Sequence, residues 1–70
     1  MYVNGIVKFH VGDSVVFFNN MNVLNTESNK QEYILSGRIM VITEMLDNDT
    51  YILHYKYKMT KDEIIKNCVH

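Results

Sequence analysis

The sequence contains few of the residues that cross-link a chain or bind a metal. It has no proline, no tryptophan, three glycines and a single cysteine, Cys68. One cysteine excludes an internal disulfide, and a lone thiol is typical of proteins from a reducing compartment. The three histidines, His10, His54 and His70, do not stand at zinc-ligand spacing to one another or to the cysteine. We therefore expect no disulfide, no metal and no cofactor.

The sequence also lacks strong net charge and long apolar runs. Its formal charge is −1 and its pI is about 6.2, so no strong field attracts nucleic acid or an anionic membrane. No apolar run approaches the roughly 18 residues of a membrane span, and the first residues lack the basic region of a signal peptide. We expect a cytoplasmic chain without membrane contact. The asparagine-, isoleucine- and lysine-rich composition suggests an A/T-rich genome, such as that of a low-GC bacterium or one of its phages.

The length sets a further limit. Seventy residues make one domain, residues 1–70, and a chain of this size buries only about 60% of its unfolded surface. Small domains usually add disulfides, a metal or oligomerisation. With the first two set aside, we expect a homo-oligomer or a permanent protein partner.

Runs of β-forming residues separated by turn residues predict a mainly β fold. We expect strands at about 6–9, 14–18, 33–46 and 51–59, with a bend at Ser36-Gly37 and a polar loop or hairpin tip at 25–31. In 51–59, strict alternation puts Tyr51, Tyr55 and Tyr57 on one face and the lysines on the other.

A capping box follows the last strand. Thr60 and Glu63 can satisfy each other's backbone amides, and apolar residues then repeat at helical spacing. We expect a helix at about 61–68. The predicted fold class is a small SH3-like barrel, or a strongly bent antiparallel sheet, with a short C-terminal helix.

The order of these segments resembles SH3-like small barrels of the KOW or Tudor type. The matching segments are "VGDSVVF" (11–17), "SGRIMVI" (36–42), "TYILHY" (50–55) and the terminal helix. The resemblance implies a Gly-Asp turn that opens the first core strand and a later glycine at the bend of the sheet. Residues 18–35 are longer than a usual barrel loop, and the Gly-Asp turn lacks the basic residues of a nucleic-acid-binding KOW module. No binding residues are carried over.

The run Val15-Val16-Phe17-Phe18 does not alternate as a strand with one wet face should. One of its faces enters the core. The other lies under the C-terminal helix or is exposed as an edge strand that joins another chain. We predict a non-catalytic protein-binding module, for instance a small phage-encoded inhibitor of a host protein. Partner binding is assigned to Val16, Phe18 and Tyr33.

A second hypothesis concerns the stretch "YILHYKYKM". Its tyrosines could stack bases in a nucleotide or single-stranded nucleic acid, between subunits, with Arg38 contributing charge. The residues assigned to this alternative site are Arg38, Tyr51, Tyr55 and Tyr57. We do not favour it, because the lysines of the strand fall on its opposite face and tyrosines also occur in small cores.

No residue set predicts catalysis. Asp47-Asn48-Asp49 lacks the Gly and Glu of a calcium loop and is typical of a β-turn. His10 and His54 could act as general bases only with an oriented partner and a pocket, and a chain of 70 residues rarely encloses a reaction site. Cys68 lies on the apolar stripe of the expected helix, where cysteine packs as a small hydrophobe. We therefore predict neither catalytic nor metal-binding residues and no enzyme activity.

Overall fold

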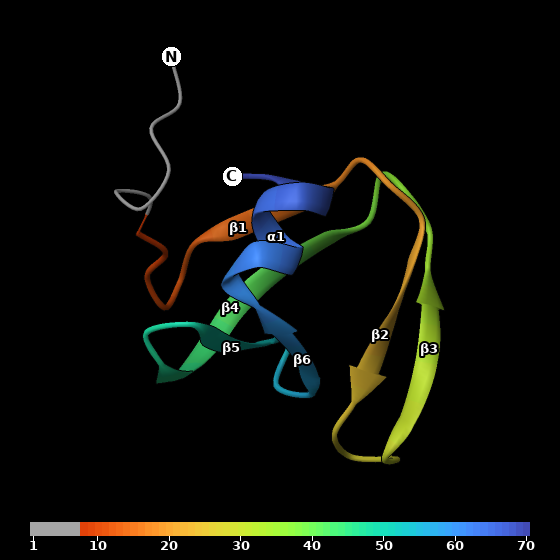
Figure 1. The fold of residues 1–70 in the computed structure, drawn as a ribbon, viewed down its shortest axis with the longest axis horizontal. Coiled ribbons are helices and arrows are strands. Elements are labelled where there is room, and N and C mark those ends of the chain that lie inside the picture. Colours follow the sequence, from red (N-terminus) through yellow and green to blue (C-terminus); the bar gives the residue numbers. More distant parts are fainter. Residues whose placement is uncertain (1–7) are drawn as a thin grey trace.

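The computed structural model describes residues 8–70. It confirms the mainly β fold class. Seven antiparallel strands form one strongly curled sheet, a half-barrel, accompanied by a short C-terminal helix (Figure 1). The elements are β1 (Ser14–Phe17), β2 (Met21–Asn25), β3 (Lys30–Ile34), β4 (Ile39–Asp47), β5 (Thr50–Leu53), β6 (Tyr57–Thr60), α1 (Lys61–Asn67) and β7 (Cys68–Val69).

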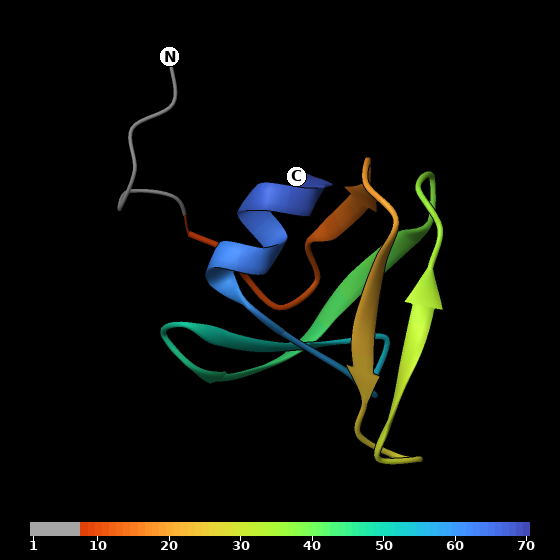
Figure 2. The same cartoon turned by 45° about the vertical axis from the view of Figure 1, so that its right-hand side comes forward.

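The strand order in the sheet is β3-β2-β6-β5-β4-β1-β7. The β2–β3 hairpin therefore lies at one edge and the two-residue β7 at the other. In Figure 2, β2 and β3 lie on one side of the molecule and α1 on the other, with β1 and β4 between them. No helix in the described part of the chain is long and apolar enough to cross a membrane.

The core is apolar and draws on nearly every element. On β1 the alternation is regular, so Val15 and Phe17 are buried while Val16 and Phe18 are exposed. The helix contributes Ile64, which is fully buried in the same cluster. The buried apolar residues of the cluster are Phe9, Val15, Phe17, Val23, Ile34, Met40, Ile42, Tyr51, Leu53, Tyr57, Met59, Ile64 and Cys68.

The predicted strand 51–59 is wrong, because the chain reverses in its middle. β5 and β6 are separate strands that pair with each other, Leu53 opposite Tyr57. The turn between them holds His54 and Tyr55 at φ 54° and 66°. Tyr51 and Tyr57 still share the core face of the sheet, and only Tyr55 leaves the predicted common face of tyrosines.

The predicted strand 33–46 is also two strands. Gly37 has φ +92°, a conformation that glycine adopts without strain, and the chain there leaves β3 to begin β4. These two strands are not neighbours in the sheet. Of the predicted strand 6–9, residues 6 and 7 lie outside the described residues, and Lys8 and Phe9 belong to no strand.

The polar segment 25–31 proves to be a hairpin tip between β2 and β3. The Asn25 side-chain oxygen accepts from the backbone amides of Glu27 and Ser28 at 2.9 and 3.3 Å. An asparagine that bonds to the backbone in this way stabilises a tight turn. The sequence located this turn but missed β2, because residues 19–24 lack a clear alternation.

The predicted capping box is confirmed. The Glu63 amide donates to the Thr60 hydroxyl at 3.2 Å, and the Thr60 amide donates to the Glu63 carboxylate at 2.8 Å. The helix ends at Asn67, one residue before the predicted end. Cys68 and Val69 then form β7, which pairs with β1.

Candidate functional site

The outward face of β1 carries an apolar row that crosses three strands. Val16 lies opposite Ile39 of β4 and opposite Val69 of β7, and residues opposite one another in an antiparallel pair share a face of the sheet. The side chains of Val16, Ile39 and Val69 are 38%, 58% and 57% exposed. An exposed row of three β-branched residues in register is a feature of interaction surfaces.

Phe18 extends this row beyond the end of β1. It is half exposed, and its amide donates to the Asn67 carbonyl at 2.8 Å, which continues the pairing with the C-terminal segment. We call Val16, Phe18, Ile39 and Val69 the outer apolar surface. Three polar residues that border it, Ser14, Asn19 and Asn67, are uncharged, and the Asn19 amide donates to the Asn67 side chain at 3.2 Å.

The predicted apolar edge strand is wrong. β1 lies between β4 and β7, so its backbone is paired on both sides and the sheet edges are β3 and β7. The helix does not cover the second face of β1 either, since Val16 and Phe18 remain exposed. What β1 offers is therefore a side-chain face and not a free strand edge.

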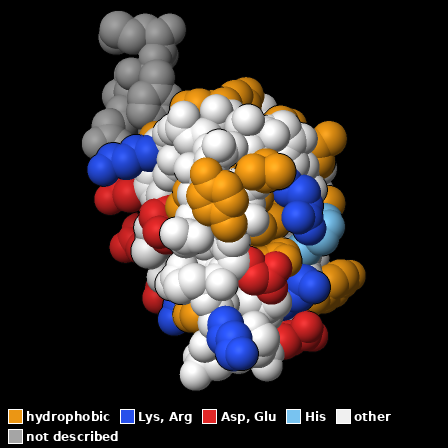
Figure 3. All heavy atoms as spheres, turned by 90° about the vertical axis from the view of Figure 1, so that its right-hand side faces the viewer, with side chains coloured by type: hydrophobic (Ala, Val, Ile, Leu, Met, Phe, Trp, Pro, Cys, Tyr) orange, Lys and Arg blue, Asp and Glu red, His pale blue; other side chains and the backbone are white. Residues whose placement is uncertain are grey.

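Tyr33 stands apart from the other two residues assigned to partner binding. It is exposed on β3, opposite Asn22 of β2, at the far edge of the sheet from β7. Leu35, two residues further along, is equally exposed. Figure 3 looks onto this side of the molecule and shows exposed apolar side chains at its centre, with Lys, Arg and His side chains beside them.

The residues of the alternative ligand site do not come together. Tyr51 and Tyr57 are buried core residues, and their hydroxyls donate to the Asn48 carbonyl at 3.2 Å and to the Glu32 carboxylate at 2.9 Å. Tyr55 is 83% exposed in the β5–β6 turn. Arg38 is exposed in the turn before β4. Only the last two are accessible to a ligand.

Glu32 is held by a polar network on the inner side of the β2–β3 hairpin. The Asn25 amide and the Tyr57 hydroxyl both donate to its carboxylate. These two hydrogen bonds lower the pKa of Glu32, and the positive charges of Lys56 and Arg38 lower it further. Asn25 is itself buried. The network joins β2, β3 and β6, and its donors satisfy a carboxylate that would otherwise be costly to place there.

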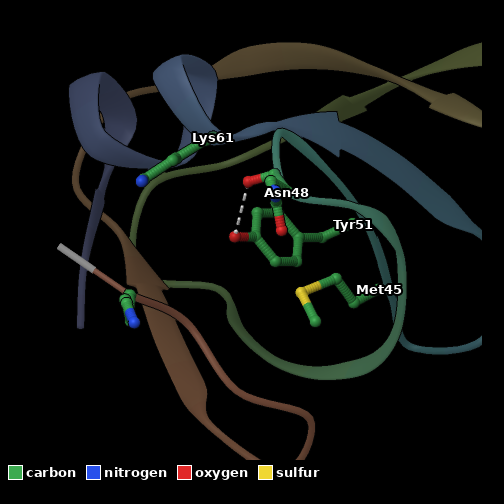
Figure 4. Close-up of a pocket in the computed structure, with 5 residues that line it drawn as sticks. Met45, Asn48, Tyr51 and Lys61 are labelled. Carbon is green, nitrogen blue, oxygen red and sulfur yellow. Dashed lines mark hydrogen bonds between the residues drawn. The ribbon is translucent and has the colours of Figure 1, made fainter. Parts of the chain in front are cut away.

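A pocket of about 420 Å³ opens beside the β4–β5 turn (Figure 4). Burial raises the pKa of its Tyr51 phenol, and the charges of Asp49 and Asp47 raise it further. The described lining offers a thioether, an amide, a phenol and two ammonium groups, without a carboxylate, thiol or imidazole that could act as a general base at neutral pH. The lining residues are Lys8, Met45, Asn48, Tyr51 and Lys61.

Asp13 and Cys68 are two further groups whose pKa is shifted. The Asp13 carboxylate accepts from the His10 amide at 2.8 Å and lies 2.9 Å from His70 Nε2. The hydrogen bond from the His10 backbone lowers the pKa of Asp13, and His70 contributes in the same direction. Burial raises the pKa of the Cys68 thiol to about 11, so this cysteine is not activated as a nucleophile.

Sequence reasoning missed Ile39 and Val69 as surface residues, although one signal was present. The run Ile39-Met40-Val41-Ile42 fails to alternate just as Val15–Phe18 does. Two neighbouring strands that are apolar on both faces imply an apolar outer surface. No such signal existed for Val69, which the helical spacing assigned to the helix.

Compared with protein-family models, curated proteins and solved structures, the chain shows no match to any of them.

Proposed function

We propose that the chain is a non-catalytic protein-binding module that joins a second copy of itself through the outer apolar surface. The observation that carries this proposal is the in-register row of Val16, Ile39 and Val69 across β1, β4 and β7. Burial of such side chains stabilises an interface by about 25 cal/mol per Å² of apolar area.

A second copy suits this surface for two reasons. A two-fold interface uses the same patch on both subunits, and the uncharged residues Ser14, Asn19 and Asn67 at its border place no like charges opposite one another. A standard interface also buries about 800 Å² per partner. That area is about a sixth of the 4670 Å² exposed by the chain, and two sheets packed face to face can supply it.

Three narrower proposals accompany this one. The Gly-Asp turn before β1 and the helix after β6 support an SH3-like barrel of the KOW or Tudor type. The lone cysteine supports a cytoplasmic location. If the chain is a phage-encoded inhibitor, the same outer apolar surface would bind the host protein in place of a second copy.

The proposal is tested by light scattering over a concentration series. The wild-type chain should show a mass well above 8.3 kDa that falls only on strong dilution. Ile39→Asp places a charge in the row and removes the burial of one large side chain, about 1.5–3 kcal/mol. Because a two-fold dimer carries the substitution on both subunits, the loss is doubled and self-association should weaken at least roughly 100-fold.

Val11→Asp is the matched control. Val11 is an exposed valine in the turn before β1, outside the outer apolar surface, and its substitution should leave the mass unchanged. Circular dichroism establishes that both variants fold. A wild-type chain that stays monomeric at every concentration contradicts the proposal and directs the search to a different protein.

A further inference from the structure

Charge is unevenly distributed along the molecule. The part formed by β2, β3, β6, the β5–β6 turn and the turn before β4 carries four cations and two carboxylates. The part formed by the end of β4, the β4–β5 turn, the start of α1 and Lys8 carries five carboxylates and two cations. The β4–β5 turn follows the last residue of β4, whereas Arg38 precedes the first residue of β4 and the β5–β6 turn is bonded to Val41 and Thr43. The first part contains Lys30, Arg38, Lys56, Lys58, Glu27 and Glu32; the second contains Glu44, Asp47, Asp49, Asp62, Glu63, Lys8 and Lys61.

The four cations of the first part lie on or beside the pair of strands β2 and β6, with Lys30 and Lys58 on opposite faces of the sheet. Asn25 of β2 pairs with Lys30 on one side and with Tyr57 on the other, and the next residue, Leu24, pairs with Lys58. Arg38 and Lys56 are both near enough to Glu32 to lower the pKa of its carboxylate. We call Lys30, Arg38, Lys56 and Lys58 the basic end.

Among the described residues, these cations have no carboxylate partners. Within residues 8–70, the ion pairs closer than 4.0 Å join His10 and His70 to Asp13, and none involves a lysine or arginine. The Glu32 carboxylate is occupied by Asn25 and Tyr57 instead. Lys56 Nζ lies 5.4 Å from the centroid of the Tyr57 ring, whereas the exposed charges of Lys30, Arg38 and Lys58 can meet an anion from solution.

Tyr55 projects from the basic end and is held in place by the backbone. His54 and Tyr55 both have positive φ, which costs a non-glycine residue about 1–3 kcal/mol and persists only where the surroundings enforce it. Two hydrogen bonds to β4 enforce it here. The Tyr55 amide donates to the Thr43 hydroxyl at 2.8 Å, and the His54 amide donates to the Val41 carbonyl at 2.9 Å. The aromatic ring is thus presented to solvent from a rigid turn.

We propose that the basic end is a binding site for single-stranded nucleic acid. Tyr55 stacks on a base, while Arg38, Lys56 and Lys58 contact the phosphates. Free cations beside an exposed aromatic ring are the two elements of such sites. Figure 3 shows Lys, Arg and His side chains next to exposed apolar side chains on this side of the molecule. A duplex is disfavoured because its bases already stack on one another.

The probe is a fluorescein-labelled oligothymidylate of about 12 nucleotides, within the usual site size, followed by fluorescence anisotropy at about 50 mM salt. Tyr55→Ala should weaken binding by roughly 5- to 150-fold, and Tyr55→Phe should retain it. The pair Lys56→Gln and Lys58→Gln should weaken binding. The same pair should reduce the slope of log K against log salt by about 0.7 for each phosphate that is no longer neutralised.

The double variant Lys61→Gln and Lys66→Gln is the matched control. It also removes two positive charges, but outside the basic end, and should have little effect on binding. The proposal is overturned if the wild-type chain leaves the anisotropy unchanged, if Tyr55→Ala binds as well as wild type, or if the control pair weakens binding equally. Equal affinity for a duplex of the same length also overturns it. Val69→Asp changes the outer apolar surface at the opposite edge of the sheet from β2 and β3 and should not affect strand binding, so failure of this proposal and failure of self-association are distinguishable.

Discussion

The two turns that flank β5 reverse the usual relation between residue type and backbone conformation. The β4–β5 turn contains Asn48 and Asp49, which tolerate positive φ better than most residues, yet neither adopts it. The β5–β6 turn contains His54 and Tyr55, and both do. The first turn follows from its own side chains, because the Asp47 carboxylate accepts from the Asp49 amide at 2.7 Å. The second has no such local cause.

Neighbouring strands impose the β5–β6 turn. Thr43 of β4 accepts from the Tyr55 amide and donates its hydroxyl to the Ile52 carbonyl at 3.2 Å. From the other side, the amide and hydroxyl of Thr26 donate to the Lys56 carbonyl at 2.7 and 2.8 Å. A turn can thus be fixed by tertiary hydrogen bonds against its own propensity. Removing one of these tertiary hydrogen bonds should therefore change the free energy of unfolding more than a substitution within the β5–β6 turn does.

The largest effect is expected for Thr43→Val. This substitution keeps the branched shape but removes the acceptor of the Tyr55 amide and the donor to Ile52, so the free energy of unfolding should fall by about 1–2 kcal/mol. Urea unfolding measures the change. Thr43→Ser keeps the hydroxyl and serves as the control. A Thr43→Val chain as stable as the Thr43→Ser chain would show that the turn does not depend on Thr43.

A smaller effect of opposite sign is expected when the β5–β6 turn receives residues suited to it. The double substitution His54→Asn and Tyr55→Gly supplies the Asn-Gly pair favoured where both central residues have positive φ. The free energy of unfolding should rise by about 1 kcal/mol, since the strain relieved at two positions is partly offset by the freedom that glycine adds to the unfolded chain.

The other turn supplies the control for this experiment. Asp49→Gly creates the same Asn-Gly pair at 48–49, where no positive φ is required. It should lower stability by about 0.5–1 kcal/mol, because glycine adds freedom to the unfolded chain. Similar changes in both turns, measured by thermal or urea unfolding, would contradict the distinction drawn between them.

The smallest effect concerns the charges of the β4–β5 turn. Asp49 helps to keep the pKa of Tyr51 above its ordinary value of 10.0. Asp49→Asn should therefore lower that pKa slightly without restoring it, since burial is the main cause. An NMR titration of the Tyr51 ring follows it, with Glu27→Gln in the distant β2–β3 hairpin as the control. An unchanged Tyr51 pKa in Asp49→Asn would contradict this charge effect.

The pH dependence has a definite sign. The folded pKa of Tyr51 lies above that of the unfolded chain, so the phenol's contribution to stability is complete below about pH 10. It is lost as the pH rises through the folded value. Because Asp49→Asn lowers the folded pKa of Tyr51, this contribution to stability should be lost over a narrower pH range above about pH 10.

The sequence was most informative where local chemistry decides the structure. The capping box at Thr60 and Glu63, the turn at Asp47–Thr50 and the bend at Gly37 were all predictable, because the residues concerned supply their own hydrogen bonds or backbone freedom. The mainly β class followed from the composition of the runs. The β5–β6 turn was not predictable, since alternating residues continue through His54 and Tyr55 and the cause of the turn lies in Thr43, on another strand.

The candidate surfaces were likewise predictable where local sequence decides them and not where tertiary pairing does. Val16 and Phe18 were identified from a run that fails to alternate. Successive side chains of a strand point to opposite faces, so these two are exposed once Val15 and Phe17 enter the core. Val69 joins them only because Cys68 and Val69 leave the helix and pair with β1. The basic end was missed because its cations come from separate segments that the β2–β6 pairing brings together, and the predicted alternation placed Tyr55 among core tyrosines.

The pairing of β1 with β7 also has a consequence for the nascent chain. Phe17 pairs with Cys68, 51 residues later (68 − 17), so β1 lacks its second neighbour until Cys68 has been made. At translation rates of about 5–20 residues per second, this delay lasts roughly 3–10 s. β1, in which three of four residues are apolar, is therefore the strand that waits longest for its second partner. In the cell, that interval is when chaperones would engage it, and when crowding of unfinished chains on one messenger would favour their aggregation.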